Sequence, residues 1–260
     1  MAAQLPAVIT PALLASIRKQ PHLPRNTWYF VAATTLAVLN RPDEIPTVYK
    51  HVLTHGVDHG TEGAPSPEEQ LTISRRMREA LVKTAAIGGL PKTINALLEL
   101  KKHTPEQLVD EPLAFSPTSR PLEMYDVPSS QILHRGQRFF DMIYGKVSKR
   151  VMGQMDRSGT EDLGLTARLV YGYLLSNTAV LTPAETSFVL IAGLIPQDVN
   201  PQLKGHLKGA LNGGATVDEV KAVRNIAMAI CESAGMRMLD KCATGGWGWR
   251  TEPANLQPLW

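Results

Sequence analysis

The chain has 260 residues, of which 43% are hydrophobic, and its formal net charge of +3 is spread thinly along the sequence. This length allows one large domain or two small ones with an ordinary hydrophobic core. The scattered charge gives no support for nucleic-acid binding. The longest apolar runs, such as 188–195, are much shorter than the roughly 20 residues of a membrane-spanning helix. We therefore expect a globular protein that binds neither nucleic acid nor membrane.

Cysteine usage and the two ends of the sequence favour the cytoplasm. Only Cys231 and Cys242 occur, outside any C-x-x-C pair or zinc-type cluster, which suits a reducing compartment. Residues 1–42 lack acidic side chains, as mitochondrial presequences do, but prolines interrupt any long amphipathic helix there. The final Pro-Leu-Trp differs from the Ser-Lys-Leu type of peroxisomal signal. We expect a cytoplasmic protein, with a mitochondrial one as the alternative.

Apolar residues recur at helical spacing throughout the chain, whereas strand-like alternation is nearly absent, so we predict an all-α fold. A capping box formed by Ser66 and Glu69 marks the start of a long helix at Pro67. In chain order we expect helices over 10–19, 26–39, 45–55, 67–87 and 92–102, a short one after Thr104, and then 129–154, 160–176, 183–195, 201–211 and 217–234. The tail from Ala243 has no period and is expected to be irregular.

One part of the sequence has a counterpart further along. In each copy a helix with a glutamate ends at a turn of Gly and Pro, and a second helix leads to a threonine cap. The matching features are Glu79 and Glu185, the turns 88–91 and 193–196, and Thr104 and Thr216. One helical hairpin cannot bury its apolar face alone, so we infer an internal duplication of a helical module. The predicted divisions are an N-terminal helical extension (1–65), a first, degenerate module (66–110), a linker (111–130), a second module (131–236) and an irregular tail (237–260).

Five short motifs mark the second half. They are Arg135-Gly136, Ile143-Tyr144-Gly145-Lys146, Leu181-Thr182-Pro183-Ala184-Glu185, the run 206–216, and Asp218-Glu219-Val220. These motifs resemble the signature of carboxymuconolactone decarboxylases, closely over 134–236 and more loosely over 66–110. The chain is therefore similar to a two-module member of the superfamily that these enzymes form with the alkylhydroperoxidase D-like proteins. The resemblance implies a helical scaffold that assembles into homo-oligomers, from dimer to hexamer, with active sites often at subunit or module contacts.

The resemblance also implies a site for acid–base chemistry. In the family a glutamate lies early in one helix and a histidine lies in the next, and here these positions are Glu185 and His206. Imidazole can transfer a proton near neutral pH, and a carboxylate can orient it. Lys204 and Lys208 flank the histidine and could attract an anion at a pocket rim. The alternative is that His206 only packs between helices and Glu185 only completes the Thr182 capping box.

The first module keeps only part of this pattern. Glu79 corresponds to the family glutamate, but Ile94 stands where the second module has its histidine. Either this copy is structural, or Glu79 shapes a substrate pocket with Arg78, Lys83 and Asn95. We take Glu79 and Arg78 as candidate substrate-binding residues.

The predicted function is that of a lyase, either a decarboxylase or an isomerase, acting without metal or other cofactor on a small anionic metabolite. Alkylhydroperoxidase D enzymes carry C-x-x-C ahead of the histidine, where this chain has Val199 and Gln202, so thiol chemistry cannot use those positions. Two alternatives stay open. One is a peroxidase that uses Cys231 or Cys242, and the other is a noncatalytic oligomeric binding or assembly protein.

A histidine pattern in the first quarter of the chain and a tryptophan pair in the tail are two further candidate features. His51, His55 and His59 have a spacing that can bind zinc or nickel, but Gly56 is expected to end the helix first, so we predict no metal site. The Trp247 and Trp249 pair could cover a pocket or dock onto a neighbouring subunit.

Overall fold

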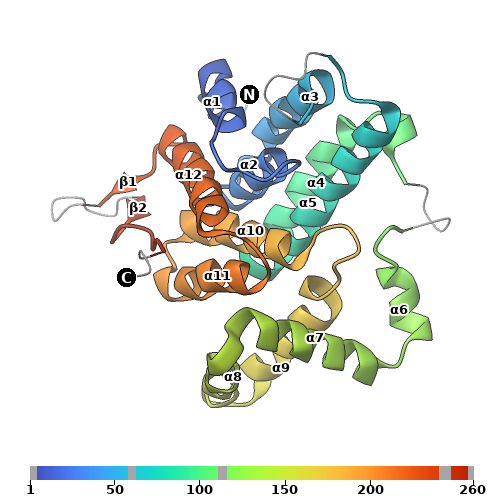
Figure 1. The fold of residues 1–260 in the computed structure, drawn as a ribbon, viewed down its shortest axis with the longest axis vertical. Coiled ribbons are helices and arrows are strands. Elements are labelled where there is room, and N and C mark those ends of the chain that lie inside the picture. Colours follow the sequence, from blue (N-terminus) through green and yellow to red (C-terminus); the bar gives the residue numbers. More distant parts are fainter. Residues whose placement is uncertain (1–4, 58–62, 111–115, 240–246, 257–260) are drawn as a thin grey trace.

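A computed structural model describes residues 5–57, 63–110, 116–239 and 247–256 of the chain. It confirms the all-α class, because helices dominate the described residues (Figure 1). The α-helices are α1 (Pro11–Arg18), α2 (Trp28–Val38), α3 (Ile45–His55), α4 (Pro67–Gly88), α5 (Leu90–Lys102), α6 (Arg120–Asp126), α7 (Ser129–Tyr144), α8 (Ser148–Asp156), α9 (Asp162–Leu169), α10 (Pro183–Leu194), α11 (Asn200–Asn212) and α12 (Val217–Ser233). The shorter elements are the 3-10 turns η1 (Pro42–Glu44), η2 (Glu106–Leu108), η3 (Gly145–Val147) and η5 (Ile195–Gln197), the π-helix η4 (Val170–Leu175), and the strands β1 (Arg237–Met238) and β2 (Gly248–Trp249).

Helix ends follow local signals in the sequence. Ser66, Thr182 and Thr216 each accept a hydrogen bond from the backbone N–H three residues ahead, which satisfies a donor that the first turn leaves open. The helix α4 ends at Gly88, and the next residue, Gly89, has a φ of 81°, in the left-handed region that glycine favours. The expected bounds of α1 to α5 and of α10 to α12 therefore agree closely with the structure.

Several expectations between these helices need correction. The short helix expected after Thr104 is only the turn η2, because the Thr104 hydroxyl donates back to the carbonyl of Leu100 rather than capping a new helix. The predicted linker, 111–130, contains the helix α6 within its described part. The helix expected over 129–154 divides into α7, η3 and α8 at Gly145, where φ is 53°.

Two more differences concern α9 and the tail. The helix expected over 160–176 ends as the π-helix η4, which periodicity does not distinguish from an α-helix. In the tail, β1 and β2 pair in parallel through Arg237 and Gly248 and through Met238 and Trp249, so the described part is not wholly irregular.

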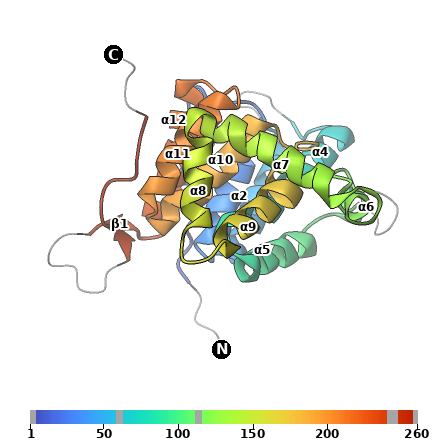
Figure 2. The same ribbon diagram turned by 90° about the horizontal axis from the view of Figure 1, so that it is seen from below.

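The helix α2 lies at the centre of the packing, and all of its residues are buried. A helix that is apolar on every side is stable only inside a core. It contacts α3, α4, α5, α10 and α12, and it lies among these helices in Figure 1, while Figure 2 shows it between α10 and α5. The segment 1–65, expected as an extension, thus supplies the central helix, while the proposed division into modules stays a prediction.

The two copies of the predicted duplication meet at one residue of α2. A Cβ added at Gly88 would lie 3.1 Å from Val38 Cγ2, and one added at Gly193 would lie 3.3 Å from the same atom. These glycines occupy matching positions in the two Gly-and-Pro turns. The corresponding helices α4 and α10 also pack directly on each other. The duplication itself stays a prediction, and in the described residues after Thr104 the turn η2 stands where α12 follows Thr216.

Candidate functional site

Buried charged and polar side chains gather where α4 meets α10 and the end of η4. We call Glu79, Lys83, Arg120, Asn177 and Thr186 the α4 cluster. Glu79 and Lys83 are one turn apart on α4, so they share a helix face, and they are only 3% and 0% exposed. Arg120 comes from the start of α6, and Thr186 comes from α10. Both halves of the chain therefore contribute to this cluster.

Lys83 is fully bonded within the cluster. Its Nζ donates to the carbonyls of Leu175 (3.2 Å) and Asn177 (2.8 Å) and to Thr186 Oγ1 (2.6 Å), one acceptor for each ammonium proton. Glu79 Oε1 lies 3.6 Å from the same nitrogen. Burial lowers the pKa of Lys83 to about 8, although the Glu79 carboxylate acts in the opposite direction. The amine therefore titrates close to neutral pH.

Arg120 closes the cluster from the side of α6. It donates from Nη1 to Glu79 Oε2 at 2.7 Å and from Nη2 to Glu79 Oε1, a bidentate pair. It also donates to the carbonyls of Tyr173 (3.1 Å) and Leu174 (2.9 Å). Lys83 and Arg120 thus bind carbonyls at the C-terminal end of η4, where cations are favoured. These hydrogen bonds stabilise the end of η4, a type of helix that is frequent at functional sites.

Glu185 does not lie in hydrogen-bond contact with His206, contrary to the arrangement that the family pattern implies. Its carboxylate pairs with Arg76 of α4, and its Oε2 accepts from the backbone N–H of Thr182 at 2.9 Å. Arg76 is further fixed by the carbonyl of Asn26 at 3.0 Å. Glu185 therefore completes the capping box with Thr182, as in the structural alternative, and its pair with Arg76 also joins α10 to α4.

His206 instead lies against Tyr144, which is linked in turn to Tyr171. It is 5% exposed, and its Nε2 lies 3.4 Å from the hydroxyl of Tyr144, which in turn accepts a hydrogen bond from Tyr171 at 3.3 Å. Its Nδ1 is buried and has no hydrogen-bond partner in the described part of the chain. Burial lowers the pKa of His206 to about 4, so the ring is neutral at neutral pH. Tyr144 lies in one of the five motifs, but helical spacing alone does not place it beside a histidine 62 positions later.

The other predicted site residues lie apart from both clusters. Arg78 donates to the carbonyl of Leu108 at 2.8 Å and pairs with Asp110, so it does not join Glu79 at a common site. Lys204 and Lys208 are exposed on α11. Lys83 was expected only as a possible pocket residue beside Glu79, but it makes three hydrogen bonds within the α4 cluster. Its signal was a lysine one turn after Glu79 on the inward face of an otherwise apolar stretch.

The cysteine and metal hypotheses gain little from the structure. Cys231 is buried, which raises the pKa of its thiol and suppresses the reactive thiolate, while Cys242 lies outside the described residues. His51 and His55 stack at 4.3 Å, but His59 is again outside them. Over the described ranges no group of three His, Cys, Asp or Glu is placed to hold a metal, and no helix is long and apolar enough to cross a membrane.

Two surface pockets and the tryptophans of the tail lie away from the α4 cluster. One pocket lies between α1 and α3, and the other lies beside α5, so neither borders the α4 cluster or His206. Trp249 is buried and donates from Nε1 to the carbonyl of Ile195 at 2.9 Å, whereas Trp247 is about half exposed. Trp249 thus fixes the tail onto its own chain.

Comparison with known proteins decides the family. No protein-family model matches the chain. The chain is 38% identical to Peroxisomal protein 2 of Schizosaccharomyces pombe over 209 residues, which cover 80% of this chain and 87% of that protein. The chain belongs to the Peroxisomal protein 2 family. Peroxisomal protein 2 of Saccharomyces cerevisiae is 34% identical over an alignment that covers 82% of this chain and 90% of that protein.

Membership of the Peroxisomal protein 2 family corrects one expectation and leaves another as a proposal. The expected cytoplasmic location is contradicted, because both relatives are named as peroxisomal proteins. The expectation rested on composition and on one terminal signal, whereas receptors that recognise targeting signals determine the compartment. The relation of the Peroxisomal protein 2 family to carboxymuconolactone decarboxylases rests on the sequence motifs alone.

Proposed function

We propose that the chain is a peroxisomal enzyme that moves protons on a small anionic metabolite without a cofactor, as a lyase of the decarboxylase type or as an isomerase. The names of the two relatives support the compartment. The resemblance of residues 134–236 to carboxymuconolactone decarboxylases supports the class of reaction. The observation that carries the proposal is Lys83, a buried amine with a pKa of about 8 beside a carboxylate and a guanidinium.

Lys83 suits general acid–base catalysis better than the other buried groups. A proton donor or acceptor works best when its pKa lies near the working pH, and lysines are brought into this range by burial. Thr186 Oγ1 and the backbone carbonyls hold the amine in one position, and Glu79 modulates its charge. Arg120 is the most exposed member of the charged trio, at 17% of its side chain. In this proposal an anionic substrate approaches from the Arg120 side and exchanges with Glu79 at the guanidinium.

His206 is a second candidate centre, supported by its unpartnered Nδ1. A neutral imidazole can polarise a substrate carbonyl by hydrogen bonding, without first carrying a charge. Tyr144, rather than Glu185, would orient the ring in this role. In this role the exposed Lys204 and Lys208 would not contact the substrate and would only attract its negative charge from a distance. The low pKa of His206 makes it a weaker proton acceptor near neutral pH than Lys83.

The test is turnover of a panel of small 2-oxo and 3-oxo acids, followed by release of CO2 and by NMR detection of deuterium exchange from the solvent. We expect Lys83→Met to lower kcat/KM by about 100-fold or more, and we expect Lys83→Arg to remove a limb of the pH profile near pH 8. Lys149→Met, at an exposed position on α8, is the matched control and leaves turnover unchanged. Full turnover by folded Lys83→Met would rule out Lys83 and make His206→Gln the next variant to measure.

The compartment is tested separately by imaging. A fluorescent protein fused to the N-terminus, which leaves the C-terminal end unaltered, should overlap with a peroxisomal matrix marker in yeast cells. A diffuse signal, or one that overlaps with a mitochondrial marker, would contradict this part of the proposal.

We also propose that the protein self-associates through α5. Leu90, Ile94 and Leu98 are 65%, 51% and 56% exposed and are spaced four residues apart, so they form one apolar stripe on that helix. A second copy of the chain is the partner that the resemblance implies. The noncatalytic assembly alternative shares this surface and differs only in lacking turnover.

A further inference from the structure

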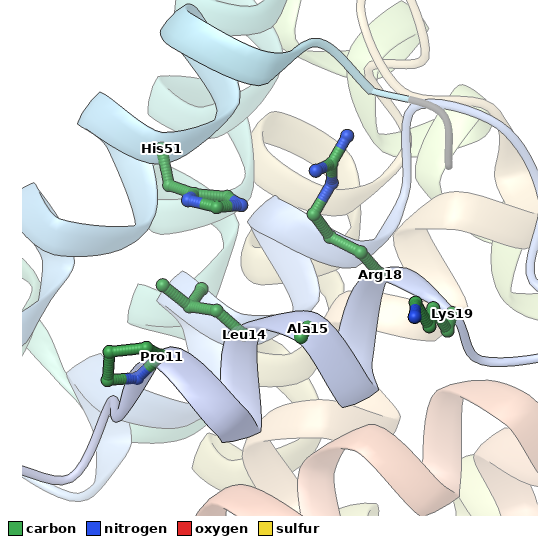
Figure 3. A pocket seen from close by; sticks show the side chains of 6 residues that line it. All are labelled: Pro11, Leu14, Ala15, Arg18, Lys19 and His51. Atoms are coloured by element: carbon green, nitrogen blue, oxygen red, sulfur yellow. The ribbon is translucent and has the colours of Figure 1, made fainter. Parts of the chain in front are cut away.

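A pocket of about 250 Å³ lies between the N-terminal helix α1 and the helix α3. Five of its six lining residues belong to α1 or its end, and the sixth, His51, reaches across from α3 (Figure 3). The lining residues are Pro11, Leu14, Ala15, Arg18, Lys19 and His51. None of them belongs to the α4 cluster or to the surroundings of His206, so this pocket is a separate feature of the molecule.

The pocket is apolar along one side and basic at its end. Pro11, Leu14 and Ala15 present only hydrocarbon, whereas Arg18 and Lys19 follow at the end of the same helix (Figure 3). Arg18 donates from Nη2 to the carbonyl of His55 at 2.8 Å, which fixes its position beside α3. Two cationic side chains, Arg18 and Lys19, therefore lie at this end of the pocket, and none of its six lining residues is acidic.

His51 contributes a buried ring nitrogen, Nε2, that makes no hydrogen bond to the described residues. The ring is held edge-on to Trp28 at 6.0 Å and stacked on His55 at 4.3 Å, so its orientation is fixed. A buried polar atom without a hydrogen bond is costly, and a ligand oxygen would remove that cost. Burial, together with the nearby His55 and Arg18, lowers the pKa of His51.

We propose that this pocket binds a monocarboxylate with a short alkyl chain. The alkyl chain lies against Pro11, Leu14 and Ala15, and the carboxylate faces Lys19, Arg18 and the imidazole of His51. This division between apolar wall and basic end matches an amphiphilic anion better than a sugar, a nucleotide or a cation. The inference does not depend on the proposed catalytic centre.

The experiment is a titration of the full-length protein with octanoate, followed by calorimetry and by NMR of the histidine rings. We expect saturable binding with a Kd below about 1 mM, together with a shift of the His51 resonances and a rise in the pKa of His51 when the carboxylate is bound. Octanol, which has the same chain without the charge, should bind at least about tenfold more weakly, and octylamine should not bind.

Matched variants test the location. Lys19→Glu should weaken octanoate binding by about tenfold, whereas Lys50→Glu, which makes the same charge change at an exposed position on α3 outside the lining, should not. Ala15→Phe should block the pocket, whereas Ser16→Phe, at the next exposed position of α1, should leave binding intact. Because Ala15 and Ser16 are both exposed, neither change threatens the fold.

Three results would overturn the proposal. One is the absence of binding up to millimolar octanoate. Another is equal affinity for octanoate and octanol, which would leave only an apolar groove. The third is binding that survives Ala15→Phe, which would place the ligand elsewhere.

Discussion

Burial lowers the pKa of both His206 and Lys83 but leaves them in different charge states at neutral pH. The pKa of His206 falls to about 4, so the ring is neutral, whereas that of Lys83 falls to about 8, so most of the amine is protonated. The difference follows from the reference values and from the neighbours, because Lys83 has the Glu79 carboxylate at 3.6 Å, whereas the partner of His206 in the described part of the chain is the neutral hydroxyl of Tyr144. Each side chain therefore changes the free energy of unfolding over a different pH range.

Protonation of His206 is expected to lower the stability of the fold in acid. Its pKa in the folded state lies below the unfolded value of 6.5, so the stabilisation is complete above pH 6.5 and is lost as the pH falls towards 4. The full effect is about 3 kcal/mol. Urea unfolding between these pH values should therefore show a shallower pH dependence for His206→Leu than for the wild type. His134→Leu, at an exposed position on α7, serves as the control, and parallel curves for wild type and His206→Leu would contradict the assignment.

Deprotonation of Lys83 is expected to change the stability of the fold in the alkaline range. The folded pKa of about 8 is below the unfolded value of 10.5, so the fold favours the uncharged amine and stability should rise with pH between these values. Lys83→Met removes this rise, whatever its effect on the absolute stability, and unfolding measured at several pH values between 8 and 10 detects it. If the variant keeps the same slope, another group causes the alkaline rise.

At the scale of elements, the close approach of α7 and η4 depends on two glycines. A Cβ added at Gly136 would lie 2.5 Å from Gly172 Cα, a contact with backbone that no side-chain movement can relieve. This approach brings the end of η4 towards Arg135, which donates to the carbonyl of Gly172 at 3.2 Å. Helical periodicity predicted both helices, but only the packing explains why glycine stands at each contact.

Gly136→Ala should therefore destabilise the protein although alanine favours helices, by about 1 to 3 kcal/mol, because the two backbones must separate. Chemical denaturation measures the change. The control is Gly153→Ala in α8, where the added Cβ meets only the flexible end of Arg157 at 3.0 Å and helix propensity should offset the contact. Equal effects at both positions would show that helix propensity alone, and not the close approach, decides the outcome.

At the scale of the whole molecule, the buried and exposed apolar surfaces divide sharply. The core is continuous from α2 through α4, α10 and α12, yet α5 leaves a stripe of leucine and isoleucine open. A surface of this kind is expected at a contact between protein chains.

Ile94→Glu should shift the protein towards monomer, because it places a charge in the centre of the α5 stripe. Sedimentation velocity at several concentrations reports the change. The comparison variant is Leu163→Glu on α9, which replaces another leucine that is 50% exposed. If Leu163→Glu dissociates the assembly and Ile94→Glu does not, the interface lies on α9; if the wild type is monomeric, the proposal fails.

The sequence by itself determined the all-α class and most helix bounds, because caps, glycine turns and apolar periodicity act within a few residues of one another. It also pointed to Glu79, Glu185 and His206, but not to their neighbours. Glu79 meets Arg120, 41 positions later, and Glu185 meets Arg76, 109 positions earlier. Such pairs, and the desolvation that lowers the pKa values of Lys83 and His206, arise only when distant helices pack together. The tertiary structure therefore decided which charged groups are joined, which are buried and which can exchange a proton near neutral pH.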